Sequence, residues 1–185
     1  MLLGDDPAAL PAAPRLLAPT EVWDLLAPEV TEALAPARAR IEALFGAATP
    51  ATVVLDSFEA MYWHFRHLQG REAWQVDGPL IERYQPPLGP GVAQRFAWAQ
   101  EVPDDKVAAA SAFRAQFRAR LAALLGDDGV LLMPTVPDIA PRISDDADGL
   151  EHYRNSAIRM LCVSGLSGFP QLSLPLACLL YTSDA

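Results

Sequence analysis

The sequence predicts an α/β fold in which part of a mixed sheet is layered by helices. Three short runs, at 52–55, 129–133 and 171–174, contain apolar residues and lie beside or close to a proline, as expected of short strands. The segments between them carry apolar residues at helical spacing, and strands separated by helices indicate a sheet covered by helices. With 185 residues, of which 51% are hydrophobic, the chain is long enough to bury a substantial core.

The N-terminal segment begins without a clear period. Residues 1–19 are rich in alanine and proline and predict an extended lead-in. From Thr20 apolar residues recur at helical spacing as far as Gly46. We expect Pro36 to kink or restart this helix, because proline removes a backbone donor from the helix interior.

A second helix is predicted directly after the strand at 52–55. Asp56 and Glu59 have the spacing of a capping box, and a single apolar face continues to Leu68. The stretch 69–90 is rich in proline and glycine and predicts an irregular aromatic loop. A short helical pattern follows at 92–99.

The longest apolar stripe predicts a helix over 104–125, which begins at Asp104 and Asp105 and ends at Gly126. The apolar run 129–133 then stops at Pro134 and is typical of a central strand. The remaining expected elements are a polar loop at 138–149, a helix at 150–163 and the strand at 171–174.

Composition and charge exclude several classes of partner. The formal net charge is −9, so the field of the chain repels nucleic acid and anionic lipid, and neither is expected as a partner. The uncharged stretch 160–183 contains two prolines and several polar residues, which favours a buried segment over a membrane helix. Only Cys162 and Cys178 are present, which excludes a disulfide scaffold and predicts a buried thiol at Cys162 and a reducing, cytoplasmic location. No secretion signal is expected at the N-terminus.

Two residue patterns could carry chemistry. His64 and His67 lie three apart on a predicted helix, but no third metal-ligand type lies near them, so a solvated face or a face between elements is expected and a metal is not. No glycine-rich phosphate loop is present, and no cofactor is expected. Ser164 and Ser167 lie between a predicted helix and a strand, the reverse of the order that a nucleophile elbow requires. The small residues there instead predict close backbone packing.

Two segments carry a family resemblance. They are Leu131–Pro141, with the sequence LLMPTVPDIAP, and Gly165–Leu176, with the sequence GLSGFPQLSLPL, separated by a loop and by Tyr153 and Arg154. Together with looser matches at 72–74 and 88–96, they resemble the C-terminal portion of the amidase signature family. The version is that of indole-acetamide-hydrolase-like bacterial amidases, and the likeness extends over residues 1–177.

The resemblance implies hydrolysis of a small amide by a lysine and two serines, without a cofactor, on an amidase-signature sheet that is incomplete here. A lysine base must be neutral and must contact the bridging serine. The only lysine, Lys106, follows two aspartates in a helical first turn, and no glycine- and serine-rich loop is present, so no catalytic residue carries over. Substrate-binding candidates are Trp74, Pro134 and Thr135; alternatively, Trp74 fills core and Pro134 simply ends a strand.

The last eight residues, 178–185, break the resemblance and are similar to a translated sequencing adapter, so we expect a non-native tail. A rival hypothesis is a non-catalytic, acidic α/β module that binds a protein partner. Exposed sheet edges would make the chain prone to aggregation. The residue pattern leaves the amide substrate and the oligomeric state open.

Overall fold

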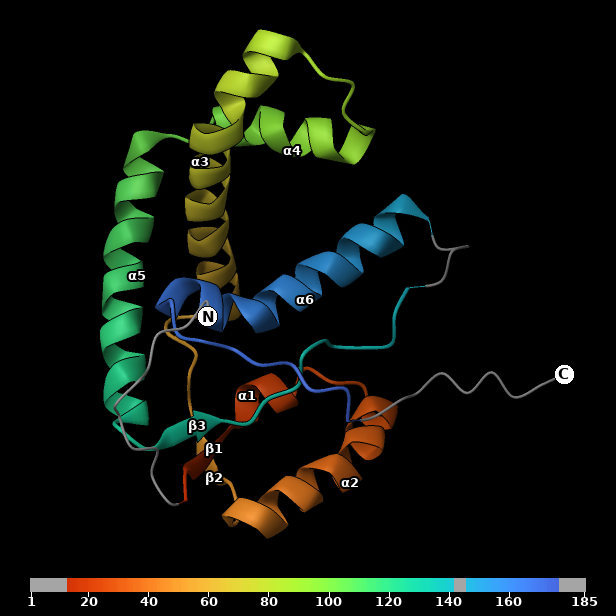
Figure 1. Ribbon diagram of the computed structural model, residues 1–185, viewed down its shortest axis with the longest axis vertical. Helices are drawn as coiled ribbons and strands as arrows, with labels where there is room; N and C mark the ends of the chain where they lie inside the picture. Colours follow the sequence, from red (N-terminus) through yellow and green to blue (C-terminus); the bar gives the residue numbers. More distant parts are fainter. Residues whose placement is uncertain (1–12, 142–145, 177–185) are drawn as a thin grey trace, which may run out of the picture.

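The computed structural model describes residues 13–141 and 146–176, which form a small sheet and a set of helices (Figure 1). The strands are β1 (Arg15–Pro19), β2 (Thr49–Ala51) and β3 (Gly129–Leu131). The helices are α1 (Thr20–Trp23), α2 (Pro28–Phe45), α3 (Phe58–Tyr84), α4 (Pro90–Gln100), α5 (Asp104–Leu125) and α6 (Ala147–Ser167). The predicted α/β class is confirmed.

The described strands form one sheet in the order β2-β1-β3, and both neighbouring pairs are parallel. Leu17 of β1 is in register with Thr49 of β2 on one side and with Leu131 of β3 on the other. Parallel strands need crossover connections, and here α1 and α2 make the first of them.

The central strand lies where the sequence predicted only an extended lead-in. Leu16, Leu17 and Ala18 of β1 are all buried, with at most 5% of each residue exposed. Burial between two partner strands explains why so short an apolar run forms a strand. The strand ends at Pro19.

The strand predicted at 52–55 forms three residues earlier, as β2. It ends at Ala51 because the backbone donors that follow are used elsewhere. The N–H groups of Val53 and Val54 donate to the carboxylate of Glu21, the second at 3.0 Å, and Arg120 donates to the carbonyl of Val54 at 3.1 Å. These side chains replace the hydrogen bonds that a longer strand would have made.

The helix predicted from Thr20 is broken at a different place from the one expected. The break falls at 24–27, between α1 and α2, where Pro28 occupies the first turn of α2. The helix α2 continues through Pro36. The helix therefore does not restart at Pro36, and a kink there stays a prediction.

The largest error concerns 69–90, which was predicted irregular but belongs to α3 as far as Tyr84. Packing against α4 and α5 outweighs the low helix propensity of Gly70 and Pro79. A side chain at Gly70 would lie 2.5 Å from the Trp98 ring of α4, so glycine allows this close approach. Arg71 bonds Asp104 of α5 at 2.7 Å.

The start of α3 is also capped one residue later than predicted. The side chain of Ser57 accepts a hydrogen bond from the N–H of Ala60 at 3.0 Å, so Ser57 and not Asp56 is the N-cap. Asp56 instead has a φ of 67° in the turn before the helix.

The C-terminal elements match the prediction in part. The helix α5 has the bounds expected of it, and α6 extends beyond the predicted 150–163, from a cap on Asp146 to Gly168 with a φ of 68°. The segment 171–174 pairs with no described strand, so that prediction is wrong for this structure.

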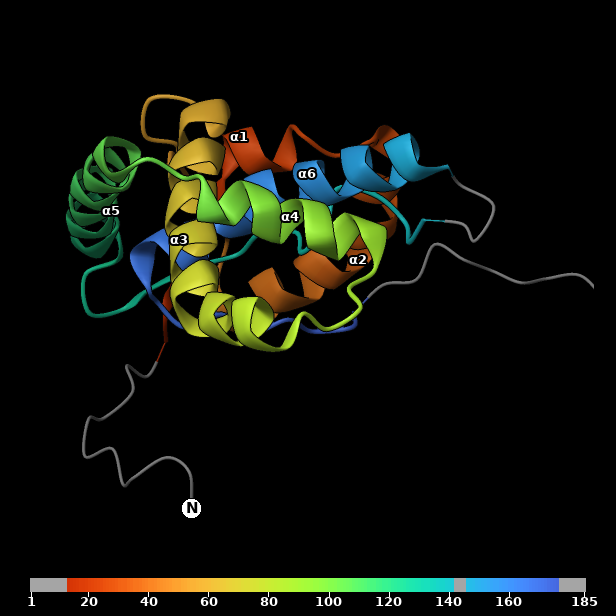
Figure 2. The same cartoon turned by 90° about the horizontal axis from the view of Figure 1, so that it is seen from above.

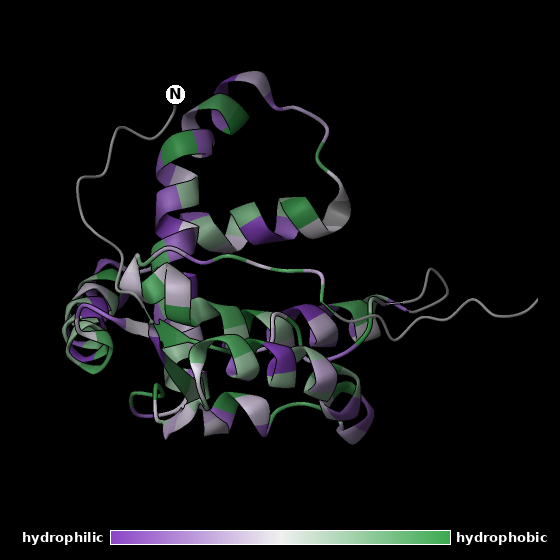
Figure 3. Ribbon diagram, turned by 60° about the horizontal axis from the view of Figure 1, so that its bottom comes forward, coloured by the Kyte–Doolittle hydropathy of each residue, from purple (hydrophilic) through white to green (hydrophobic). Residues whose placement is uncertain are grey.

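The core lies where α5 and α6 pack against α3 (Figures 1 and 2). Met61, Phe117, Met160 and Leu166 are at most 1% exposed. Figure 3 shows hydrophobic and hydrophilic residues interleaved along the outer part of α3, which the core does not cover. None of the described helices is long and apolar enough to span a membrane.

Candidate ligand pocket

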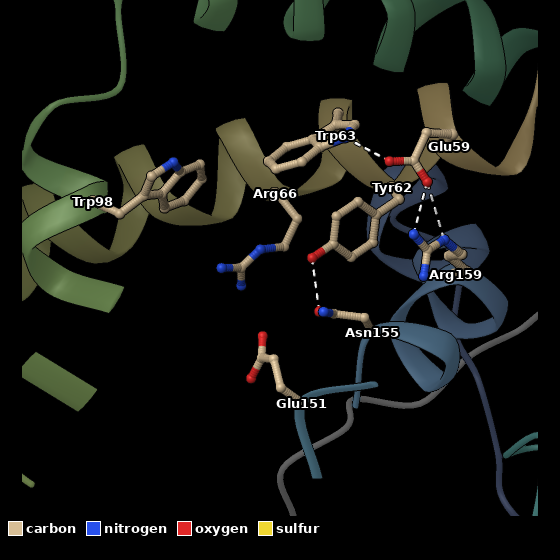
Figure 4. A pocket seen from close by; sticks show the side chains of 8 residues that line it. All are labelled: Glu59, Tyr62, Trp63, Arg66, Trp98, Glu151, Asn155 and Arg159. Carbon is tan, nitrogen blue, oxygen red and sulfur yellow. Dashed lines mark hydrogen bonds and ion pairs between the residues drawn. The ribbon is translucent and has the colours of Figure 1, made fainter. Parts of the chain in front are cut away.

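One face of α3 forms an open pocket with α4 and α6 (Figure 4). Its volume is about 300 Å³, at the lower end of the range for small-molecule sites. Its lining combines aromatic rings with charged groups. The eight lining residues are Glu59, Tyr62, Trp63 and Arg66 of α3, Trp98 of α4, and Glu151, Asn155 and Arg159 of α6.

The carboxylate of Glu59 accepts hydrogen bonds from two side chains, those of Arg159 and Trp63. Arg159 bonds one of its oxygens at 2.7 and 3.2 Å, and the Trp63 indole N–H donates to the other at 2.7 Å. The hydrogen bonds from Arg159 and then Trp63 lower the pKa of Glu59 below its usual value. Glu59 is therefore a structural anion and a poor general base.

A second set of contacts joins α3 to α6 beside this ion pair. The Tyr62 hydroxyl bonds the Asn155 side-chain oxygen at 2.8 Å. The Arg159 guanidinium lies over the Tyr62 ring, 4.9 Å from its centroid. These contacts hold the pocket wall in one arrangement.

Arg66 differs from Arg159 because it has no acidic partner within ion-pair distance among the described residues. Its guanidinium lies 5.0 Å from the centroid of the Trp98 ring, and its Nη1 donates to Gln69 at 3.0 Å. Its Nε is buried and has no hydrogen-bond partner in the described part of the chain.

The charges around Arg66 come from all three helices. Burial is the main cause that lowers the pKa of Arg66, and the nearby cations Arg154 and Arg95 lower it further, whereas Tyr62 and Glu151 raise it. An arginine side chain stays protonated in proteins. Arg66 is therefore a partly desolvated cation whose charge is only partly balanced.

This set of side chains is suited to binding and not to covalent catalysis. Among the described residues, no serine, cysteine, lysine or histidine lines the pocket. Of its two carboxylates, Glu59 is held by Arg159 and Trp63, and Glu151 lies 3.4 Å from Arg154. The pocket offers one guanidinium nitrogen, Nη2 of Arg66, that has no partner among the described residues, together with aromatic walls.

None of the three predicted substrate-binding residues lines this pocket. Trp74 lies half-buried on α3, with its ring beside Gly78 of the same helix, and is not on a loop. Pro134 is buried and Thr135 exposed after the end of β3. Their role in binding stays a prediction.

The two histidines face neighbouring helices, which agrees with the prediction of a face between elements and not with a solvated face. The His64 ring stacks on Phe113 of α5 at 4.2 Å, and the His67 ring lies between Trp63 and Trp98 at 5.8 and 6.1 Å. Burial is the main cause that lowers the pKa of both. Within residues 13–141 and 146–176, no cluster of acidic, histidine and cysteine side chains has the arrangement of a metal site.

The groups considered as nucleophiles or bases lie elsewhere. Cys162 is buried, as predicted, and burial raises the pKa of its thiol to about 12. The Ser167 hydroxyl is buried and bonded to backbone groups of Ser164 and Phe169. Lys106 is exposed in the first turn of α5. Cys178 lies outside the described residues.

The sequence did contain a signal for the pocket that was missed. Glu59, Tyr62, Trp63 and Arg66 have the spacing of one helical face, next to the apolar stripe of the same helix. Their partners on α6 lie about 90 residues later and share no local pattern with them, so spacing alone could not have assembled the site.

Comparison with known proteins identifies the class of fold. No family model matches the chain. A crystal structure of an amidase matches with a TM-score of 0.61 over 83% of this chain and 38% of that one; at 17% identity, this shows a shared fold. The chain is therefore amidase-like in architecture.

Curated relatives point to the same class. Amidase 1 of Arabidopsis thaliana is 34% identical over 122 residues, and Amidase 1 of Oryza sativa subsp. japonica is 41% identical over 97 residues. These matches cover 66% and 52% of this chain but only 29% and 22% of the relatives. Outer envelope protein 64, chloroplastic, of Arabidopsis thaliana is 29% identical over 109 residues, which are 59% of this chain and 18% of that protein.

Proposed function

We propose that this chain is the C-terminal portion of an amidase, and that the intact enzyme hydrolyses a carboxamide to a carboxylate and ammonia or an amine by acyl transfer to serine. The observation that carries the proposal is the sequence similarity to the two plant Amidase 1 proteins, in a chain that spans less than a third of their length. The amide would be a small molecule, and no cofactor would be needed.

The finer part of the proposal is that the enzyme is of the indole-acetamide-hydrolase-like bacterial type and that residues 1–177 follow its catalytic segment. The segments Leu131–Pro141 and Gly165–Leu176 support this assignment. The exposed Lys106 and the bonded Ser167 support the view that the lysine and serines lie upstream of this portion. Residues 178–185 would be a non-native tail.

The proposal also concerns the location and the partners of the intact enzyme. We infer a cytoplasmic enzyme without nucleic-acid or membrane partners, and the support is the net charge of −9 and the low cysteine content. In the intact enzyme Trp74, Pro134 and Thr135 would contribute to the substrate pocket wall. Pro134 and Thr135 follow the end of a parallel strand, which is where ligands bind in open α/β sheets.

The test compares the chain with a version extended by its upstream reading frame. We expect the upstream sequence to contain a lysine followed by a glycine- and serine-rich loop with two serines. The extended protein should release ammonia from acetamide or benzamide and lose this activity when that lysine is replaced. The 185-residue chain should release none.

Two outcomes would overturn the proposal. Ammonia release by the 185-residue chain, abolished by replacing one of its own serines, would show that the catalytic group lies within it. An upstream frame without the lysine and serine loop, in a protein that stays inactive, would favour the non-catalytic binding module instead.

A further inference from the structure

The pocket between α3, α4 and α6 presents a cation whose charge is only partly balanced, in a strongly acidic chain. The other arginine that lines it, Arg159, is paired with Glu59 at 2.7 Å, whereas Arg66 has no such partner among the described residues. Arg154 and Arg95 add positive charge close enough to act on Arg66. Burying such a cation has a cost that a bound anion would offset.

The geometry of Arg66 shows which part of it is available. Stacking on Trp98 uses the face of the guanidinium, and the bond to Gln69 uses Nη1. Nε is enclosed by the protein, whereas Nη2 makes no hydrogen bond within the described residues and is not among the buried atoms, so Nη2 is the nitrogen left to donate a charge-assisted hydrogen bond to a carboxylate. Figure 4 shows the guanidinium of Arg66 pointing into the pocket from α3.

We propose that this pocket binds a small monocarboxylate with a flat apolar body, its carboxylate on Nη2 of Arg66 and its body against the aromatic walls. A single negative charge fits because Arg66 is the one lining cation without an acidic partner among the described residues, whereas Arg159 is paired with Glu59. Tyr62, Trp63 and Trp98 supply the apolar surface, and a volume of about 300 Å³ limits the ligand to a small molecule. The site lacks a nucleophile, so its role is binding and is independent of amide hydrolysis.

The test uses benzoate as the probe and benzamide as its uncharged counterpart of the same shape, titrated into the 185-residue chain by calorimetry at low salt. We expect saturable binding of benzoate, with benzamide weaker by about tenfold because it lacks the charge that Arg66 recognises. Equal binding of the two, or no binding of benzoate, would overturn the proposal.

Two variants change the charge of the pocket in opposite directions. Arg66→Gln should weaken benzoate binding by about tenfold, and Glu151→Gln should strengthen it by about threefold because a like charge is removed. Arg83→Gln is the matched control, because Arg83 also lies over an aromatic ring, that of Tyr84 at 5.1 Å, but does not line the pocket. Benzoate binding should be unchanged in this control.

Circular dichroism spectra would verify that each variant folds. If Arg66→Gln does not fold, Glu151→Gln still decides the matter, since Glu151 is exposed. Weaker benzoate binding in Glu151→Gln would contradict the proposed charge arrangement. Benzoate binding that is present in the 185-residue chain and absent from the extended protein would show that the protein supplies its own carboxylate, and would overturn a small-molecule site.

Discussion

Gly165 sets how closely α6 approaches α3. A Cβ at this position would lie far inside van der Waals contact with Cε2 of Phe65. The sequence predicted close backbone packing from the small residues around 164–168, and the structure shows the partner to be an aromatic ring on α3. The glycine is thus needed for packing and not for a special backbone angle.

Gly165→Ala should lower the free energy of unfolding by about 1–3 kcal/mol, because the ring or the helix must move to admit the methyl group. In an unhindered helix the same change stabilises by roughly 0.5–1 kcal/mol. Gly91→Ala in α4 is the control, since its Cβ would meet only Arg95, at 3.5 Å. Urea denaturation of both variants measures the difference, and a Gly165→Ala protein as stable as the control would contradict this packing.

His64 links acid stability to the contact between α3 and α5. Its Nδ1 is buried without a hydrogen-bond partner among the described residues, and its ring stacks on Phe113. Burial lowers the pKa of His64 from 6.5 in the folded state, with Lys106 lowering it and Asp56 raising it. The unfolded chain then binds the proton first, so stability is present above pH 6.5 and is lost as pH falls through the folded pKa.

His64→Phe should therefore be at least as stable as the parent at pH 7 and should lose less stability between pH 7 and 5. The physical reason is that phenylalanine keeps the ring stacking and removes the buried titratable group. Part of the acid sensitivity should remain, because the pKa of His67 is also lowered by burial. Urea midpoints across this pH range measure the effect. The control is His152→Gln, which alters an exposed histidine of α6 and should leave the dependence of stability on pH as it is in the parent. If His64→Phe also left this pH dependence unchanged, His64 would be excluded as its source.

The helix α3 shows at the scale of an element why local signals were insufficient. It passes through Gly70, Gly78 and Pro79, which are residues that end helices when nothing packs against them. Contacts with α4 and α5 keep it helical, whereas α5, with an uninterrupted apolar stripe and a glycine stop, was predicted correctly from sequence. Elements that rely on their own periodicity were thus predictable, and those that rely on distant partners were not.

Pro79→Ala tests whether the helix is intrinsically favoured at this point. Alanine restores the N–H that can donate to the carbonyl of Gln75 and relieves the clash of the ring, so the free energy of unfolding should rise by about 1 kcal/mol or more. Pro87→Ala in the connection to α4 should instead lower stability slightly, by less than about 1 kcal/mol, because it only loosens the unfolded chain. Thermal unfolding compares the two, and a less stable Pro79→Ala protein would show that α3 depends on the proline.

At the scale of the whole molecule, sequence predicted the α/β class and the order of most elements, but not which strand is central or which helices enclose the pocket. The strand β1 was missed because only Leu16, Leu17 and Ala18 carry the signal, and its strand character comes from two partners far along the chain. The pocket depends on α6 reaching α3, a contact between residues about 90 positions apart. Both features are products of assembly.

The segment 169–176 includes a strand predicted from sequence, at 171–174, that the described sheet lacks. Leu172 and Leu174 alternate with polar neighbours as in a strand, yet they are 81% and 54% exposed and pair with no described strand. An exposed apolar segment of this type favours pairing with another chain. A protein whose remaining strands lie elsewhere in a longer polypeptide would have this surface covered.

The double variant Leu172→Asp, Leu174→Asp should therefore reduce self-association of the 185-residue chain while its free energy of unfolding changes by less than about 0.5 kcal/mol, because both side chains are already exposed. Sedimentation velocity over a range of concentrations measures the association, and urea denaturation measures the stability. Leu44→Asp in α2 is the matched control: its side chain is 77% exposed, but it lies on a helix and offers no free strand edge, so association should persist. If Leu44→Asp reduced self-association as much as the double variant does, the cause of association would be general surface hydrophobicity and not the unpaired segment 171–174.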